Sequence, residues 1–154
     1  MGVLRRIRRL RRRDALLLWQ ALGAVLLVRG YLGRGAHHDL RRMIEAHGLA
    51  RPAAGRGAPR ADLAEIAWSV RAAARLVPGA SCLTQASAGQ ILLARRGHAT
   101  TIRLSVPAQT ATPGTLAPHA WLMAGDTIVL GGTPEDYNRH RILHDFTLPD
   151  AGRA

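Results

Sequence analysis

Residues 15–32 form an apolar run that is broken only by Gln20 and Arg29. Its cleanest stretch is shorter than the roughly 20 apolar residues that a membrane-spanning helix needs. A basic segment precedes the run, as in a signal peptide, but Arg29 and Arg34 lie toward its end and no clean cleavage site follows. A helix that is apolar almost all round needs partners on several sides. We therefore expect a buried or interface-facing helix, with a membrane span and a cleaved signal as the alternatives.

Positive charge is concentrated just before that run. All 22 basic residues of the 154-residue chain are Arg, and seven of them lie within residues 1–13. The net charge of +12 therefore belongs mostly to this segment, which by Coulomb attraction suits an acidic partner, an anionic membrane or nucleic acid. No nucleic-acid recognition motif follows, and three Trp, two Tyr and one Phe are too few for a base-stacking platform. Specific nucleic-acid binding is not expected.

The composition of the chain predicts a packed core, because 47% of the residues are hydrophobic and only 21% are charged. Residues 37–48 have the pattern of a short amphipathic helix that ends at Gly48. Residues 49–61 contain two Pro and two Gly with no apolar period, which predicts a linker. We therefore divide the chain into a basic, apolar helical region over 1–48, a linker over 49–61 and a core over 62–150.

Two helices are predicted at the start of the core. Asp62, with Glu65 three residues later, resembles a capping box, and helical apolar spacing continues up to Pro78-Gly79. Residues 82–96 contain no Pro and end in two Arg before Gly97, which is typical of a helix C-terminus.

The second half of the core has strand patterns. Apolar and polar residues alternate over 99–106, which predicts a strand. Two further strands are expected over 119–124 and 127–130, with Gly125-Asp126 as the hairpin turn between them. Residues 137–148 suit either a strand or a short helix.

The single cysteine, Cys82, opens the second predicted helix of the core. Amides and the dipole at a helix N-terminus favour a thiolate, and the same amides stabilise an oxyanion on an attacked carbonyl. His119 opens a predicted strand, and an imidazole beside a thiol exchanges protons with it. The pair predicts a Cys-His nucleophilic site, with a buried inert Cys and a structural His as the alternative. One Cys excludes an internal disulfide and a Cys-based zinc cluster.

The sequence around these residues resembles the transglutaminase-like leader peptidases of lasso-peptide biosynthesis, the peptidase half of the split B protein. The resemblance is best over 62–133 and rests on Cys82-Leu83, Arg95-Arg96-Gly97 and His119-Ala120-Trp121. It implies an α+β, papain-like, transglutaminase-type core, in which the nucleophile helix packs on a small antiparallel sheet. It also implies cleavage of a ribosomal precursor between leader and core, with Cys82 as nucleophile, His119 as general acid/base, and no cofactor.

Sites of this kind usually orient the histidine with an Asp on the next strand. If Gly125-Asp126 is the turn, the position opposite His119 falls near Gly132, which has no carboxylate. Asp126 is favoured as a turn residue, whereas a bend after the Gly-Gly step would return Asp136 or Glu135 to the ring. A backbone carbonyl or a Gln would orient the ring equally. We predict Asp126 or Asp136 as the third member and leave open a site without an acid.

The resemblance implies partners besides the precursor peptide, namely a leader-binding recognition protein and the cyclase that closes the lasso ring. We expect the chain in the cytoplasm, with residues 1–32 as a candidate contact with a membrane surface. No metal site is expected, because no acid or Cys cluster completes the available histidines, His37, His38, His47, His140 and His144. The alternatives to a peptidase are a non-catalytic transglutaminase-like binding module and a basic, membrane-associated helper protein.

Overall fold

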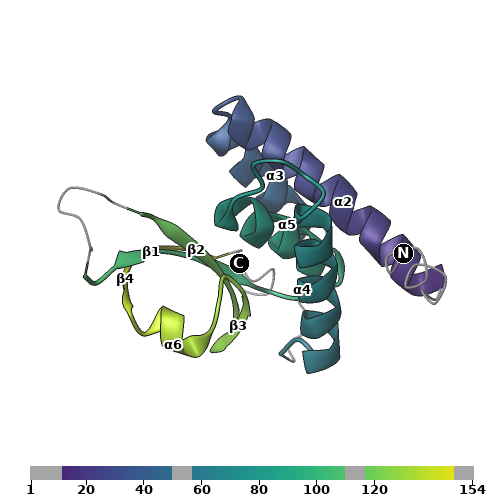
Figure 1. The fold of residues 1–154 in the computed structure, drawn as a ribbon. Helices are drawn as coiled ribbons and strands as arrows, with labels where there is room; N and C mark the ends of the chain where they lie inside the picture. Colours follow the sequence, from purple (N-terminus) through teal and green to yellow (C-terminus); the bar gives the residue numbers. More distant parts are fainter. Residues whose placement is uncertain (1–11, 50–56, 110–116, 148–154) are drawn as a thin grey trace, which may run out of the picture.

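The computed structural model describes residues 12–49, 57–109 and 117–147, in which four long helices are followed by a four-stranded antiparallel sheet (Figure 1). The order of the sheet is β3-β2-β1-β4. This mixed architecture confirms the predicted α+β class, with a nucleophile helix on a small sheet and a helical N-terminal extension. The elements are α2 (Arg12–Gly33), α3 (His37–Leu49), α4 (Arg60–Ala74), α5 (Cys82–Arg95), β1 (Thr101–Pro107), β2 (His119–Ala124), β3 (Thr127–Leu130), the short α6 (Pro134–Tyr137) and β4 (His140–Thr147).

The helices cover one face of the sheet (Figure 1). Ala120 and Leu122 of β2 belong to the same hydrophobic cluster as the buried residues of the helices. Because side chains alternate along a strand, His119 and Trp121 lie on the opposite face. Gly89 of α5 marks the closest approach of helix and sheet, since a Cβ there would lie 2.6 Å from the side chain of Leu122.

Helix α2 has two apolar faces. One face is buried and packs with α4 and α5, so the region 1–48 shares a single hydrophobic cluster with the core; its residues are Leu17, Ala21, Ala24, Val25 and Val28. The opposite face is exposed and carries Leu16, Trp19, Leu26 and Leu27. By length and composition alone the 22-residue helix would be able to cross a membrane, although 28% of its most apolar window is buried within the protein.

The start of α4 differs from the prediction. The helix begins at Arg60, within the predicted linker, and its N-cap is Pro59, which provides no side-chain cap. The predicted capping box at Asp62 is wrong, because this carboxylate lies inside the helix, where it forms an ion pair with Arg96 at 3.2 Å and a hydrogen bond with His98 at 2.8 Å. Residues 50–56 of the predicted linker lie outside the described residues.

The hairpin prediction is confirmed, since Ala124 pairs with Thr127 across a turn at Gly125-Asp126. The undecided segment 137–148 contains a strand, β4, which pairs antiparallel with β1 at the edge of the sheet. Most β4 residues are exposed, so the strand lacks the apolar alternation by which its sequence would have been recognised.

Candidate active site

Cys82 is the first residue of α5, and its side chain is half-buried against the hydrophobic cluster. Ser81 caps the helix: its hydroxyl accepts from the Thr84 amide, and the Thr84 hydroxyl accepts from the Ser81 amide, both at 3.2 Å. Cys82 and Leu83 lie between these two capping residues, and their backbone amides have no hydrogen-bond partner among the described residues. Two free amides at the positive end of a helix suit negative charge on the sulfur or on a bound carbonyl oxygen.

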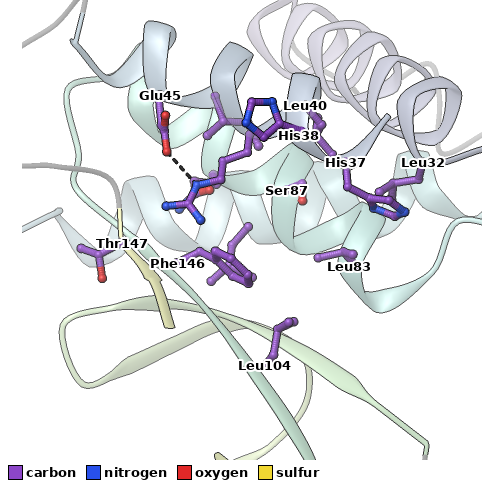
Figure 2. Close-up of a pocket in the computed structure, with 14 residues that line it drawn as sticks. Leu32, His37, His38, Leu40, Glu45, Leu83, Ser87, Leu104, Phe146 and Thr147 are labelled. Carbon is purple, nitrogen blue, oxygen red and sulfur yellow. Dashed lines mark hydrogen bonds and ion pairs between the residues drawn. The ribbon is translucent and has the colours of Figure 1, made fainter. Parts of the chain in front are cut away.

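The first turn of α5 lies over the end of the sheet at which β2 begins. Leu83 lines a cavity together with Leu104 of β1, as Figure 2 shows. Leu104 pairs with Ala120, the second residue of β2. Gln90, two turns later in α5, donates to the carbonyl of Thr100 just before β1. The first turn of α5 therefore lies toward the end of the sheet at which His119 begins β2, although Cys82 and His119 are distant in the sequence.

The ring of His119 is held by a backbone group. Its Nε2 atom lies 2.6 Å from the carbonyl oxygen of Gly131. A carbonyl only accepts, so Nε2 carries the proton, and in the neutral ring Nδ1 is then a free base. Trp121 packs edge-on against the ring, with 4.5 Å between the ring centroids. A backbone carbonyl thus occupies the orienting position, as in the alternative without an acid.

The Gly131-Gly132 step is explained by this contact. Gly131 has a φ of +125°, which residues with a side chain rarely adopt. A Cβ at this position would also lie 2.7 Å from the Trp121 ring. Only glycine brings the chain close enough to Trp121 for the carbonyl to reach His119, so a Gly at this point is consistent with an oriented histidine.

A chain of hydrogen bonds fixes Trp121 on the outer face of the sheet. The indole N–H donates to the Ser105 hydroxyl at 2.7 Å, and Ser105 is 2.9 Å from Nδ1 of His140. The ring of His140 lies 5.5 Å from that of His119. Burial, with repulsion from the His119 charge, lowers the pKa of His140, which favours a neutral ring beside the candidate base.

The ion pair between Arg103 and Asp145 lies on the same face of the sheet, next to this chain of hydrogen bonds. Arg103 donates to both carboxylate oxygens of Asp145, at 2.7 and 2.6 Å, and also to the hydroxyl of Tyr137. The hydrogen bonds from Arg103 lower the pKa of Asp145, and those to Asp145 and Tyr137 raise the pKa of Arg103. Tyr137 in turn stands edge-on to Trp121 at 5.2 Å, so the pair supports the aromatic cluster around His119.

The acids predicted as a third member have other contacts. Asp126 is an exposed residue of the hairpin turn, and Glu135 is exposed at the start of α6. Asp136 accepts from the backbone and side chain of Thr133, and these hydrogen bonds lower its pKa. None of the three makes a hydrogen bond to His119 within the described residues. Their role as an orienting acid remains a prediction.

The structure brings Cys82 and His119 to one end of the sheet without joining them. No hydrogen bond links the two side chains among the described residues, and His119 shares the sheet face of Trp121 rather than the helix-covered face. Catalytic hydrogen bonds are often longer in the absence of substrate. The assignment of both residues stays a prediction.

Sequence analysis missed the supporting residues Ser105 and Tyr137 and the position of His140. Ser105 pairs with His119 across β1 and β2, a relation that follows only once the strand register is known. His140 is placed by β4, which the sequence left undecided. Within the described residues no group of three or more His, Cys, Asp or Glu is arranged to hold a metal ion.

One comparison with known proteins gives a match. The model of the transglutaminase-like superfamily matches residues 24–144, which include α3 to α5, all of β1 to β3 and the first half of β4. No curated protein and no solved structure matches the chain.

Proposed function

Because the chain belongs to the transglutaminase-like superfamily, we propose that it is a cysteine peptidase that removes the leader from a ribosomally made lasso-peptide precursor. The observation that carries the proposal is that a helix-terminal thiol, Cys82, and a histidine lie at the same end of the sheet, and that Nδ1 of this histidine has no partner among the described residues. The specific substrate class comes from the sequence resemblance around Cys82-Leu83 and His119-Ala120-Trp121.

The proposed reaction begins with proton transfer from the Cys82 thiol to Nδ1 of His119. The thiolate adds to the scissile carbonyl, and the amides of Cys82 and Leu83 donate to the oxyanion that forms. When the intermediate collapses, the C–N bond breaks and His119 returns its proton to the leaving amine. Water, deprotonated by His119, then hydrolyses the thioester and regenerates the thiol. Gly131 keeps the ring in the tautomer that both steps need.

The contacts of His119 also favour one alternative. A transglutaminase-like binding module that does not catalyse would need neither a hydrogen bond between Cys82 and His119 nor a carboxylate on the ring, and the described residues provide neither. Such a module would bind the precursor peptide without cleaving it.

The proposed peptidase acts with partners and without a cofactor. On the sequence resemblance alone, we propose that a separate protein binds the leader and that the lasso cyclase takes the released core peptide. We place these steps in the cytoplasm.

We further propose that residues 1–32 contact an anionic membrane surface. A basic, membrane-associated helper protein, the other alternative to a peptidase, would make the same contact. Leu16, Trp19 and Leu26 are 59%, 74% and 53% exposed on one face of α2. Seven Arg lie within residues 1–13, directly before this face. Apolar side chains next to clustered positive charge favour the surface of a bilayer that contains acidic lipids.

The peptidase proposal is tested by cleavage of the precursor peptide from the neighbouring reading frame, with and without its leader-binding partner. Wild type, Cys82→Ala and His119→Ala are compared, and Arg42→Ala is the control because Arg42 is exposed on α3 and does not line the cavity. We expect no cleavage by Cys82→Ala, roughly 10²- to 10⁴-fold slower cleavage by His119→Ala, and an unchanged rate for the control. Binding of the precursor without cleavage by wild type would instead establish the binding module.

The third residue is tested in the same assay with Asp126→Asn and Asp136→Asn. An orienting acid would be recognised by a fall of two or more orders of magnitude in kcat. Rates within a few-fold of wild type for both variants would leave the Gly131 carbonyl as the group that orients His119.

A further inference from the structure

A cavity of about 350 Å³ lies between α3, α5 and the edge of the sheet formed by β1 and β4 (Figure 2). Its walls are mostly apolar and are drawn from all of these elements. A dry site of roughly 150 Å³ lined by such residues is large enough for benzene, so this cavity has room for a whole aromatic or branched side chain. The apolar residues that form it include Leu40, Ile44, Leu83, Ile102, Leu104 and Phe146.

The wall of the cavity includes a serine hydroxyl. Ser87 of α5 is only 2% exposed, and its hydroxyl makes no hydrogen bond with the described residues. Its neighbour Gln90, by contrast, donates to the carbonyl of Thr100 at 3.1 Å. Among the described residues the buried side-chain polar atom without a partner is the Thr100 hydroxyl, so the Ser87 hydroxyl is open to the cavity and can hydrogen-bond a bound peptide.

The cavity begins next to the candidate nucleophile. Leu83 forms part of its wall, and its Cα is about 3.8 Å from that of Cys82. An extended peptide advances about 3.3 Å per residue. A side chain one or two residues away from a carbonyl held at Cys82 is therefore within reach of the cavity.

We propose that this cavity binds a large apolar side chain of the peptide substrate, on the amino-terminal side of the scissile bond. The inference rests on the proposed function, because it takes the ligand to be the peptide that Cys82 attacks. The amino-terminal part is the half that remains bonded to the sulfur as the acyl-enzyme, so it is the half that needs to be held through both steps. The cavity would then select a residue near the carboxyl-terminal end of the leader, one or two positions before the scissile carbonyl.

The test uses reagents that report on the cavity without requiring peptide hydrolysis. Acetyl-Gly-Gly, acetyl-Leu-Gly and acetyl-Phe-Gly chloromethyl ketones are compared as alkylating agents, and iodoacetamide measures the intrinsic reactivity of the thiol. Cys82 is the only cysteine of the chain. Whole-protein mass spectrometry therefore measures its modification once the alkylation of histidines, recorded with Cys82→Ala, is subtracted. We expect the Leu and Phe reagents to react roughly tenfold or more faster than the Gly reagent, as an apolar subsite requires.

Leu104→Trp fills the cavity, and Leu143→Trp makes the same change at an exposed position of β4 that does not line it. We expect the first variant to bring the Phe-to-Gly rate ratio close to one, whereas the second keeps the ratio of wild type. Phe146→Ala removes part of the apolar wall and enlarges the cavity. We expect it to reduce the ratio as well, because the bound side chain loses contacts. Thermal unfolding and the iodoacetamide rate show that each variant is folded with a reactive Cys82.

Equal rates for the three peptide reagents in wild type would overturn the inference, and so would an unchanged ratio in folded Leu104→Trp and Phe146→Ala. These results are independent of the cleavage assay. A protein that cleaves the precursor but shows no side-chain preference retains the proposed function and loses the subsite. A protein that shows the preference but does not cleave has a peptide-binding cavity in a non-catalytic module.

Discussion

The Nε2 atom of His119 donates a hydrogen bond to the carbonyl oxygen of Gly131 over 2.6 Å. Orientation of the candidate base thus depends on a backbone position rather than on a carboxylate. That position is tightly constrained, because Gly131 has a positive φ and is packed against Trp121. The contact explains how a site with glycine near the expected place of an acid still holds its histidine in one tautomer.

Gly131→Ala is therefore expected to reduce both stability and cleavage. The new Cβ would meet the Trp121 ring at 2.7 Å, and the positive φ adds strain, for a total of about 3 kcal/mol. The matched control is Gly125→Ala, which also has a positive φ but no atom within 4 Å of the new Cβ, and which we expect to cost about 1 kcal/mol. Urea unfolding measures both. Equal losses in the two variants would show that Trp121 does not confine the chain at Gly131.

Much of this arrangement was accessible from the sequence, and the reasons for the rest are physical. The Pro-free stretch that ends in Arg95-Arg96-Gly97 predicted the helix that begins at Cys82, and the strand patterns around a Gly-Asp turn predicted the hairpin that begins at His119. The carbonyl of Gly131 was not predicted as the partner, because every residue has one and its direction depends on a φ that no residue pattern encodes. The contacts of Ser105 required the register of three strands.

Charged side chains predicted the local structure less well than the apolar and turn residues did. Asp62 has the spacing of an N-cap, yet it pairs with Arg96 and His98, which are distant in the sequence. The carboxylate is held by these two side chains rather than by helix amides, and only the tertiary fold brings the three together. The helix begins at Arg60, two residues before the predicted N-cap.

The cap of α5 is expected to support the reactivity of Cys82. Ser81→Ala removes the hydroxyl that accepts from the Thr84 amide, which should cost about 1 kcal/mol of stability and slow alkylation of Cys82 by iodoacetamide, because the first turn frays. Thr133→Ala removes the equivalent cap of α6, which is remote from Cys82 in the sequence, and should leave the alkylation rate unchanged. Equal alkylation rates in the Ser81 variant and wild type would contradict a contribution of the helix N-terminus.

The lowered pKa of His140 predicts a loss of stability in mild acid. A histidine with a depressed pKa in the folded state binds fewer protons than in the unfolded state, so stability falls as pH drops below its ordinary value of about 6.5. The slope from this one group is at most about 1.4 kcal/mol per pH unit. His140→Gln should flatten the dependence of the urea midpoint between pH 7 and 5. His144→Gln, an exposed change on the same strand, should leave it as in wild type.

The Arg103–Asp145 pair should contribute modestly to stability, since about a third of each side chain is exposed. Its two short hydrogen bonds place it at the upper end for partly exposed pairs, so Asp145→Asn is expected to cost about 1 kcal/mol at neutral pH. The pKa of Asp145 is lowered, so this contribution is present above the ordinary value near 3.8 and is lost as the pH falls through the folded-state pKa. A double-mutant cycle with Arg103→Gln measures the coupling, and a coupling of zero would mean that the pair is only a geometric contact.

The exposed face of α2 predicts reversible binding to acidic lipid surfaces. Wild type should co-sediment with vesicles that contain phosphatidylserine, less with purely zwitterionic vesicles, and less again as salt rises and screens the Arg cluster. Trp19 is 74% exposed, and Trp19→Ala should weaken binding about tenfold through lost apolar contact with the bilayer. Trp68→Ala makes the same change on α4, where Trp68 is 43% exposed, and should bind as wild type does. Equal effects of the two Trp variants, or binding that ignores both lipid charge and salt, would assign this face to a protein partner instead.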